Sequence, residues 1–200
     1  MARTADEQRR VELLELIVDY VIENGLSDLS LRPLADAVGS SARVLLYYFG
    51  SKDRLVTALL TAAGDRQRAL FARLPRSAAS YRETVQAAWR VLSAPQNVPL
   101  FRLFFEVYGL ALQTPERFPG FLQRAVGVWL DFLEPSALRD GYSNSDARAI
   151  ATMILAGYRG FLLDLCATGE RRRLDRAVDL WIDALDTIPP PKGVPRAKRR

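Results

Sequence analysis

Residues 39 to 55 read GSSARVLLYYFGSKDRL, a short apolar and aromatic run set between two glycine–serine pairs. Ser41 is placed to accept a hydrogen bond from the backbone at the start of a helix, and the glycine that follows the run is placed to end that helix. The pattern predicts a short helix over 42–49. Leu45 and Phe49 lie four residues apart in it, so they share one face, which we expect to be buried.

Helical spacing of apolar residues continues on both sides of this stretch, and strand signals are nearly absent. Glycine, proline, serine and asparagine interrupt the spacing, with Ser30 and Ser51 as further helix caps and Pro135 as a terminator. We predict helices over residues 6–24, 31–38, 42–49, 51–74, 80–93, 98–112, 118–133, 144–168 and 171–188. The sequence therefore predicts an all-α protein, with three compact N-terminal helices and a larger helical body.

The chain contains no histidine and one cysteine, which narrows the chemistry open to it. Without imidazole there is no histidine-based nucleophile triad, general base or metal ligand. A zinc site would have to use carboxylates and a single thiol. We therefore expect no catalytic residues, no metal and no cofactor, and an enzyme built on Asp and Glu is the least favoured alternative. No apolar run approaches the roughly 20 residues of a membrane helix, so we expect no membrane partner and a cytoplasmic protein.

The net charge of +5 is a property of the C-terminal end. Residues 189–200, PPPKGVPRAKRR, hold five basic residues and no acid, so the rest of the chain is neutral. We expect a disordered tail, which either adds salt-sensitive attraction to phosphate or only keeps the terminus soluble. Residues 1–66 hold eight Lys or Arg and ten Asp or Glu, so any attraction of this half for DNA must come from local placement of charge.

Two short helices joined at Gly39-Ser40 have the dimensions of a helix-turn-helix, whose second helix lies in the DNA major groove. With Leu45 and Phe49 turned inward, Arg43 is left to pair with guanine O6 and N7. The residues expected to face DNA are Arg32, Ser41, Ala42, Arg43, Val44, Tyr47, Tyr48 and Lys52. Of these, Ala42 or Val44 suits a thymine methyl, and Tyr48 and Lys52 suit phosphates. The alternative is an ordinary helical hairpin, in which the tyrosines pack and Arg43 is a solvated charge.

Residues 30 to 55, SLRPLADAVGSSARVLLYYFGSKDRL, resemble the N-terminal signature of the TetR family, the tetracycline-repressor-like regulators of bacteria. The matching positions are Ser30, Leu34-Ala35, Gly39, Ser41, Leu45, Tyr47-Tyr48-Phe49, Ser51-Lys52 and Asp53-Arg54-Leu55. The family commonly has threonine and tyrosine, which often touch phosphate, where this chain has Val44 and Leu46. Arg43 replaces a small residue and becomes the main candidate for reading bases. The direction of Leu46, inward or toward a thymine methyl, stays open.

The resemblance implies a domain order and a set of partners. It places a DNA-binding domain at 1–50, a ligand-binding and dimerisation domain at 51–188 with 51–74 as the connecting helix, and the tail at 189–200. It implies a homodimer on a palindromic operator of double-stranded DNA, released by a small ligand, with repression as the family's habit. The alternative is an all-helical small-molecule-binding or interaction protein without specific DNA binding.

Two sets of body residues are candidates for these roles. An apolar or aromatic ligand is expected among Trp89, Phe101, Phe104, Phe105, Tyr108, Trp129 and Phe132, with Glu106 or Tyr108 as its polar contact. The dimer interface is expected at Ile150, Ile154, Gly157, Tyr158, Phe161, Leu174, Val178, Trp181 and Leu185. In both sets the alternative is that the side chains belong to the protein's own core.

Overall fold

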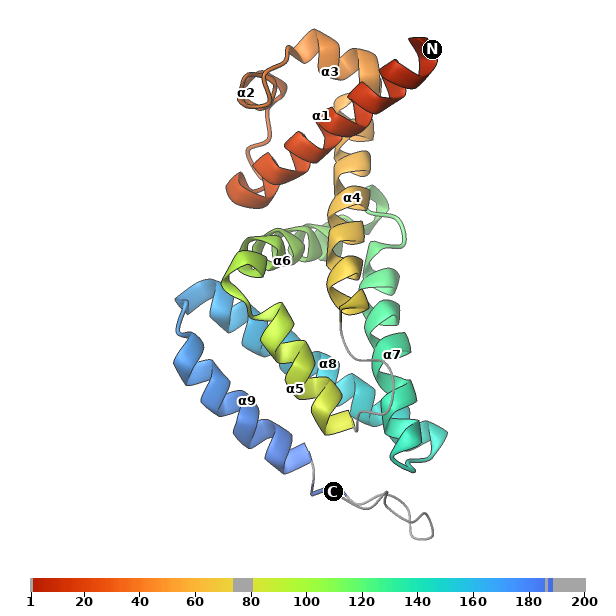
Figure 1. Cartoon of the computed structure of the whole chain (residues 1–200), viewed down its shortest axis with the longest axis vertical. Coiled ribbons are helices and arrows are strands. Elements are labelled where there is room, and N and C mark those ends of the chain that lie inside the picture. The colour runs from red at the N-terminus through yellow and green to blue at the C-terminus, as the bar shows by residue number, and fades with distance from the viewer. Residues whose placement is uncertain (1, 74–80, 186, 189–200) are drawn as a thin grey trace.

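The computed structural model describes residues 2–73, 81–185 and 187–188, and every regular element in this part of the chain is helical (Figure 1). The α-helices are α1 (Ala2–Asn24), α2 (Leu31–Ala37), α3 (Ala42–Phe49), α4 (Lys52–Ala72), α5 (Tyr81–Leu92), α6 (Val98–Gln113), α7 (Phe121–Arg139), α8 (Asn144–Thr168) and α9 (Arg171–Leu185). Two short 3-10 turns, η1 (Pro95–Asn97) and η2 (Pro115–Arg117), flank α6. The all-α prediction is confirmed.

The first three helices pack with the start of α4 around a shared core. Leu34, Leu45 and Leu55 are almost fully buried in it, and Phe49 is buried beside them. The Ser41 hydroxyl accepts a hydrogen bond from the Val44 amide at 3.3 Å, as the local pattern predicts. These contacts fix the angle between α2 and α3, and with it the face that α3 turns outward.

Two of the three predicted serine caps form. The Ser51 hydroxyl accepts from the Arg54 amide at 3.2 Å at the start of α4. Ser30 stands at the cap position of α2 with an extended backbone, but its side chain makes no capping hydrogen bond. The prediction for Ser30 was therefore wrong for its hydroxyl, although α2 begins where expected.

Some helix ends differ from the predicted ones. α1 begins at Ala2 and α9 ends at Leu185, while α7 begins later than expected and runs on to Arg139. Pro135 lies inside α7 and does not end it. Proline removes one backbone hydrogen bond, here to the carbonyl four residues earlier at Asp131, and Asp131 is exposed to water. The cost of the missing bond is therefore small enough for the helix to continue.

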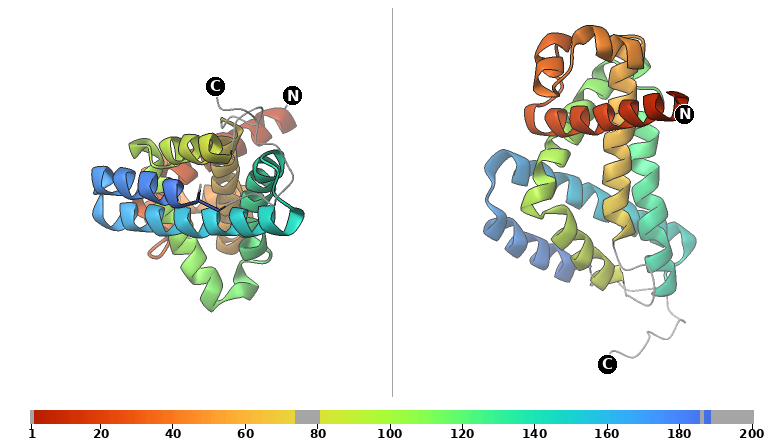
Figure 2. Two further views of the ribbon diagram at one scale, coloured as in Figure 1. Left: turned by 90° about the horizontal axis from the view of Figure 1, so that it is seen from below. Right: turned by 45° about the horizontal axis from the view of Figure 1, so that its top comes forward.

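The body is organised around α8, which packs against α5, α6, α7 and α9. Figure 2 shows α9 lying beside α8 and α4 running down beside α7 from the N-terminal helices. At the centre of the body Tyr158 is fully buried, and its hydroxyl donates to the Val85 carbonyl of α5. Burial raises the pKa of Tyr158 well above its ordinary value, so the phenol stays neutral and keeps its donor. Trp89, Trp129 and Trp181 surround this ring.

α8 is apolar on two faces. One face is buried in the body, and the other exposes Ala149, Met153, Ala156, Gly160 and Leu163. By length and composition alone α8 would suffice to cross a membrane, contrary to the expectation that no apolar run is long enough. A single such helix is weak evidence for a membrane span, because the buried face of α8 is part of the core of the folded chain.

Six of the predicted dimer-interface residues lie inside the core of this same chain. They are Ile150, Ile154, Tyr158, Leu174, Val178 and Leu185, each at most 3% exposed. Side chains buried within one chain cannot supply the surface of an interface, so the prediction was wrong for these six. The stripe that they form is the inward face of α8 and α9, and the remaining three, Gly157, Phe161 and Trp181, are partly buried.

Gly157 allows α9 to approach α8. A Cβ atom built on Gly157 would lie 2.4 Å from the Trp181 ring, whereas one built on Gly127 of α7 would meet nothing within 4 Å. We expect Gly157→Ala to lower the free energy of unfolding by about 1–2 kcal/mol, because overpacking against the indole outweighs the gain in helix propensity. Gly127→Ala is the matched control and should be neutral or stabilising. Urea denaturation of both variants measures this, and equal stabilities would contradict the role given to Gly157.

Candidate DNA-binding surface and ligand cavity

α3 presents an exposed face at the end of the molecule farthest from α8 and α9 (Figure 1). Arg43 is exposed, and Val44, Leu46 and Tyr47 are 38%, 40% and 72% exposed. Leu46 therefore faces outward, which answers the question that its sequence position left open. Exposed apolar side chains on a helix already capped and packed on its other face indicate a contact surface.

Tyr48 is turned from this face toward α1. Its hydroxyl makes a hydrogen bond with the carboxylate of Asp6, and burial of the hydroxyl together with this bond raises the pKa of Tyr48. Arg10 of α1 lies over the neighbouring Phe49 ring, 5.6 Å from its centroid. We expect Tyr48 to reach a phosphate, and in this structure its hydroxyl faces the Asp6 carboxylate of α1. Ala42 is partly buried as well.

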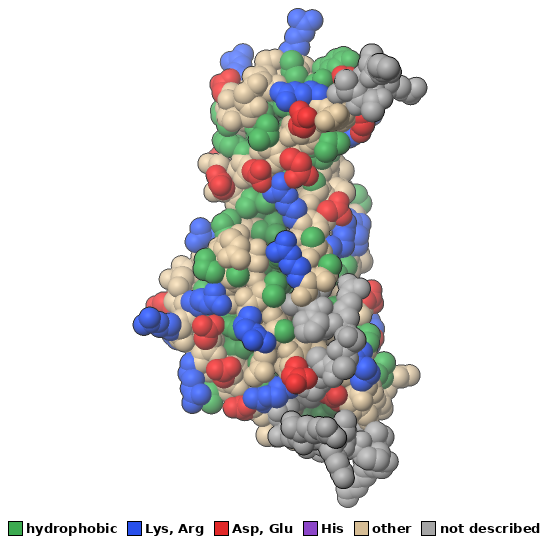
Figure 3. All heavy atoms as spheres, viewed as in Figure 1, with side chains coloured by type: hydrophobic (Ala, Val, Ile, Leu, Met, Phe, Trp, Pro, Cys, Tyr) green, Lys and Arg blue, Asp and Glu red, His purple; other side chains and the backbone are tan. Residues whose placement is uncertain are grey.

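The basic residues expected near DNA stand in the first turns of α2 and α4, the helices before and after α3. Arg32, in the first turn of α2, and Lys52 and Arg54, in the first turn of α4, are all exposed. In the face drawn in Figure 3, acidic side chains lie among the basic ones over α1 and α4, with no broad basic patch among the side chains drawn in colour. α9 ends at the opposite end of the molecule from α3, and the basic tail itself lies outside the described residues (Figure 1).

The carboxylate of Glu106, on α6, binds the loop between α1 and α2. Its Oε1 and Oε2 atoms accept from the Leu26 amide at 3.1 and 3.0 Å, and Oε1 accepts from the Ser27 amide at 2.6 Å. The Ser27 hydroxyl donates to the same carboxylate. Gly25 has a φ of 83°, and a Cβ there would lie 3.2 Å from Glu106. Glu106 is thus not the polar contact for a ligand that we expected, because its oxygens are occupied by the loop.

A second link joins α1 to α4. Arg66 of α4 donates to Asp19 of α1 at 2.5 Å and to Glu15 one turn earlier on α1. The N-terminal helices are therefore held to the body at two points, through α6 and through α4, in addition to the covalent connection.

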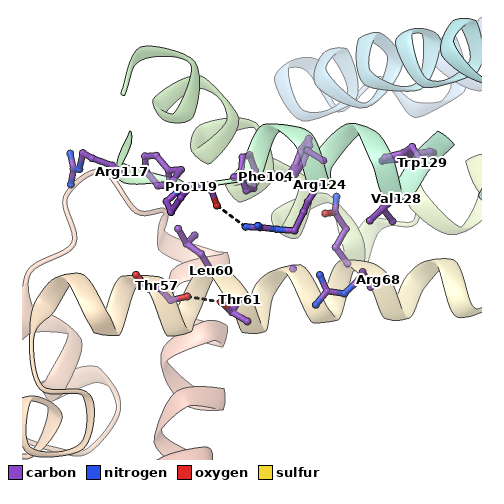
Figure 4. Close-up of a pocket in the computed structure, with 15 residues that line it drawn as sticks. Thr57, Leu60, Thr61, Arg68, Phe104, Arg117, Pro119, Arg124, Val128 and Trp129 are labelled. Carbon is purple, nitrogen blue, oxygen red and sulfur yellow. Dashed lines mark hydrogen bonds between the residues drawn. The ribbon is translucent and has the colours of Figure 1, made fainter. Parts of the chain in front are cut away.

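A cavity of about 480 Å³ lies between α4 and α7, with α6 and the η2 turn closing it (Figure 4). Its apolar lining includes Leu60, Phe104, Phe118, Phe121, Val128 and Trp129. Its polar lining consists of Thr57, Thr61, Gln67, Arg68, Arg117 and Arg124. The volume falls in the range of sites that hold small organic ligands.

Two of the seven predicted pocket residues, Phe104 and Trp129, line this cavity. The other five, Trp89, Phe101, Phe105, Tyr108 and Phe132, are not part of its lining. Trp89 is buried in the core, and its indole N–H donates to Asp175 of α9 at 2.7 Å. Tyr108 accepts from Arg159 at 3.1 Å, so its hydroxyl is a structural contact. Trp89 and Tyr108 therefore contribute to the packing of the protein itself, which was the alternative to a role in the pocket.

The residues of α4 that line the cavity were not predicted from the sequence. Thr57, Thr61, Gly64 and Arg68 recur at helical spacing on one face of α4 and all line the cavity. A stripe of small and polar residues on a helix that should be packed was the signal available in the sequence. The connecting role expected for residues 51–74 does not include this contribution to a cavity.

Comparison with known proteins agrees with this geometry. Residues 13–59, which run from the middle of α1 to the first turns of α4, match the model of the tetR family of bacterial regulatory proteins. Residues 13–59, the central part of the N-terminal helical unit, are therefore a TetR-family domain. The comparison with curated proteins found no match.

Solved structures share the fold over nearly the whole chain. A transcriptional regulator from Rhodococcus sp. Rha1 is 19% identical, with a TM-score of 0.75 over 90% of this chain and 99% of that one. A TetR-family regulator from Cytophaga hutchinsonii is 16% identical, with a TM-score of 0.76 over 91% and 95%. A TetR regulator from Legionella pneumophila is 20% identical, with a TM-score of 0.68 over 86% and 94%. At these identities the likeness shows the fold alone.

The Glu106 contact predicts a local effect of its removal. We expect Glu106→Ala to lower the free energy of unfolding by about 2 kcal/mol, because the amides of Leu26 and Ser27 lose a charged acceptor. Hydrogen exchange at these two amides should become faster than in the wild type. Glu116→Ala, which removes an exposed carboxylate from the nearby η2 turn, is the control. Unchanged exchange in the Glu106 variant would show that the carboxylate does not hold the loop.

Proposed function

We propose that this protein is a cytoplasmic transcriptional regulator that binds a palindromic operator as a homodimer and leaves it, as a repressor, when a small molecule fills the cavity. The observation that carries the proposal is the exposed face of α3 on a TetR-family domain. In this proposal residues 1–50 bind DNA, and residues 51–188 bind the ligand and form the dimer.

The exposed face of α3 suits the major groove. Arg43 is free to extend to guanine O6 and N7, and Val44 and Leu46 offer apolar contacts to thymine methyl groups. Leu46 thus joins the residues assigned to DNA from the sequence, while Tyr48 contributes by positioning α3. Arg32 and Lys52 stand at helix starts, where backbone N–H groups also attract phosphate. The net negative charge of residues 1–66 is compatible with this, because the basic groups lie on α3 and in the first turns of α2 and α4.

The outward face of α8 is the proposed centre of the dimer. Ala149, Met153, Ala156, Gly160 and Leu163 follow one another at alternating spacings of four and three residues, the repeat that packs two helices along a seam. The small residues in this repeat permit close approach of a second α8. On α9, Leu180 is 52% exposed and extends the apolar surface. A two-fold axis through this surface would present two copies of α3 to the two halves of a palindrome.

The cavity is connected to the DNA-binding helices through its own walls. Phe104 lines the cavity from α6, and Glu106, two residues later, holds the α1–α2 loop. Thr61 lines the cavity from α4, and Arg66, little more than one turn later, holds α1. A ligand that shifts α4 or α6 would therefore move α1 to α3 together. The distance between the two recognition helices of the dimer would change, and affinity for the operator would fall.

The role of Arg43 predicts the effect of removing it. We expect Arg43→Ala to weaken binding to the specific operator by about 1–3 kcal/mol, with little change in binding to unrelated DNA. Fluorescence anisotropy on the region upstream of the chain's own gene, at one stated salt concentration, measures both. Arg139→Ala, an exposed arginine at the far end of α7, is the control. A wild-type chain that binds this region no better than unrelated DNA would point instead to a helical small-molecule-binding or interaction protein.

The dimer proposal is tested at Gly160. A Cβ there would meet nothing within 4 Å in the single chain, so Gly160→Glu adds charge to the proposed seam without a clash inside the subunit. We expect sedimentation velocity at micromolar concentration to give a dimer for the wild type and a monomer for Gly160→Glu. Gln113→Glu, on the exposed end of α6, makes the same charge change elsewhere and should remain dimeric. A monomeric wild type, or a dimeric Gly160→Glu, would contradict the proposal.

A further inference from the structure

The polar lining of the cavity is made of positive charge and hydrogen-bond donors. Arg68, Arg117 and Arg124 belong to the lining, and no acidic side chain does in the part of the chain that the structure describes. Arg68 has a nearby partner in Asp65, outside the lining, and Arg117 points away from the gap between α4 and α7 (Figure 4). Arg124 is the arginine whose placement decides what the cavity can bind.

Arg124 reaches from α7 into the space above α4 (Figure 4). Its guanidinium donates to the Pro119 carbonyl at 3.3 Å, which leaves most of its five N–H donors for another partner. Gly120 makes room for this placement, because a Cβ on Gly120 would lie 2.6 Å from the guanidinium. The loop before α7 thus turns the charge of Arg124 toward the cavity.

Gln67 supplies the second observation. Its Nε2 atom is buried and has no hydrogen-bond partner, although it carries two N–H donors. A buried donor without an acceptor is unfavourable, and such groups commonly mark a position that a bound molecule or water satisfies. The hydroxyls of Thr57 and Thr61 donate along α4 to backbone carbonyls at 2.9 and 2.8 Å, and neither accepts a hydrogen bond from Gln67. The cavity therefore lacks an acceptor with negative charge.

We propose that the ligand is an organic carboxylate with an apolar or aromatic body. Its carboxylate is held by the Arg124 guanidinium and the Gln67 amide, a planar acid being the partner that the arginine fork pairs with best. Its body packs on Phe104, Phe121, Val128 and Trp129. This assignment changes the expected ligand from a wholly apolar molecule to an amphipathic acid. Only the release of DNA by the acid rests on the proposed function; the binding site does not.

The experiment compares the binding of each carboxylic acid with that of its uncharged primary carboxamide. Isothermal titration calorimetry on the full chain measures the binding of naphthalene-2-carboxylate, indole-3-acetate and decanoate against the corresponding primary carboxamides, which keep the shape and lose the charge. We expect at least one acid to bind about tenfold more tightly than its amide. Arg124→Gln should abolish that preference, and Arg139→Gln, on the same helix outside the cavity, should retain it.

Three outcomes would overturn the proposal: no acid binds, each amide binds as tightly as its acid, or Arg124→Gln keeps the preference. Arg124→Met, which keeps the aliphatic stem, takes the place of Arg124→Gln if that variant does not fold, and the same outcomes apply. Anisotropy with operator DNA separates the two proposals. An acid that binds through Arg124 without releasing DNA supports the carboxylate site and contradicts ligand-controlled release. Specific DNA binding without any preference for acids contradicts the carboxylate site alone.

Discussion

The hydrogen bonds between Glu106 and the α1–α2 loop determine how the N-terminal helices sit on the body. One carboxylate accepts from two backbone amides and a hydroxyl of a loop about 80 residues away in the sequence. Charged acceptors make the stronger protein hydrogen bonds, and this one joins two units that otherwise meet mainly along α4. With Arg66 holding α1 from the other side, α1 is tied by side-chain contacts to both α4 and α6. The outward face of α3 is built by local packing, but its direction in space depends on this contact.

Helix α8 is also constrained on two sides, because it has a buried inner face and an exposed apolar outer face. Its inner face closes the body around Tyr158, and Gly157 lets the indole of Trp181 lie against the helix. Its outer face remains apolar although a chain that acted alone would gain solubility from charge there. The buried stripe and the exposed apolar stripe lie on opposite sides of α8, so few positions on this helix remain for polar residues. This division explains both the high apolar content of α8 and the lack of any large polar face on it.

Local physics made part of this structure predictable from the sequence. Serine caps, glycines and apolar spacing define α2 and α3 within a residue, and Leu45 and Phe49 are buried as their spacing requires. Spacing alone does not say which of two apolar faces of α8 points inward, and six of the nine residues expected at an interface lie in the core of the chain itself. The Glu106 contact and the cavity depend on pairs of helices brought together by the whole fold. The spacing of residues within one helix does not show which other helix it will contact. The polar stripe on α4 is the one part of the cavity that can be recognised in the sequence.

The charge in the cavity also bounds how strongly a ligand can control the protein. A ligand shifts a conformational equilibrium only by the difference between its affinities for the two states. If the carboxylate met Arg124 and Gln67 fully in one arrangement of α4 and α7 and not in the other, the difference would be that of a charge-assisted hydrogen bond, about 1.5–3 kcal/mol. That corresponds to roughly a 10- to 150-fold change in operator affinity. Stronger control would require the apolar body of the ligand to distinguish the two arrangements as well, which Phe104 makes feasible because it sits on the same helix as Glu106.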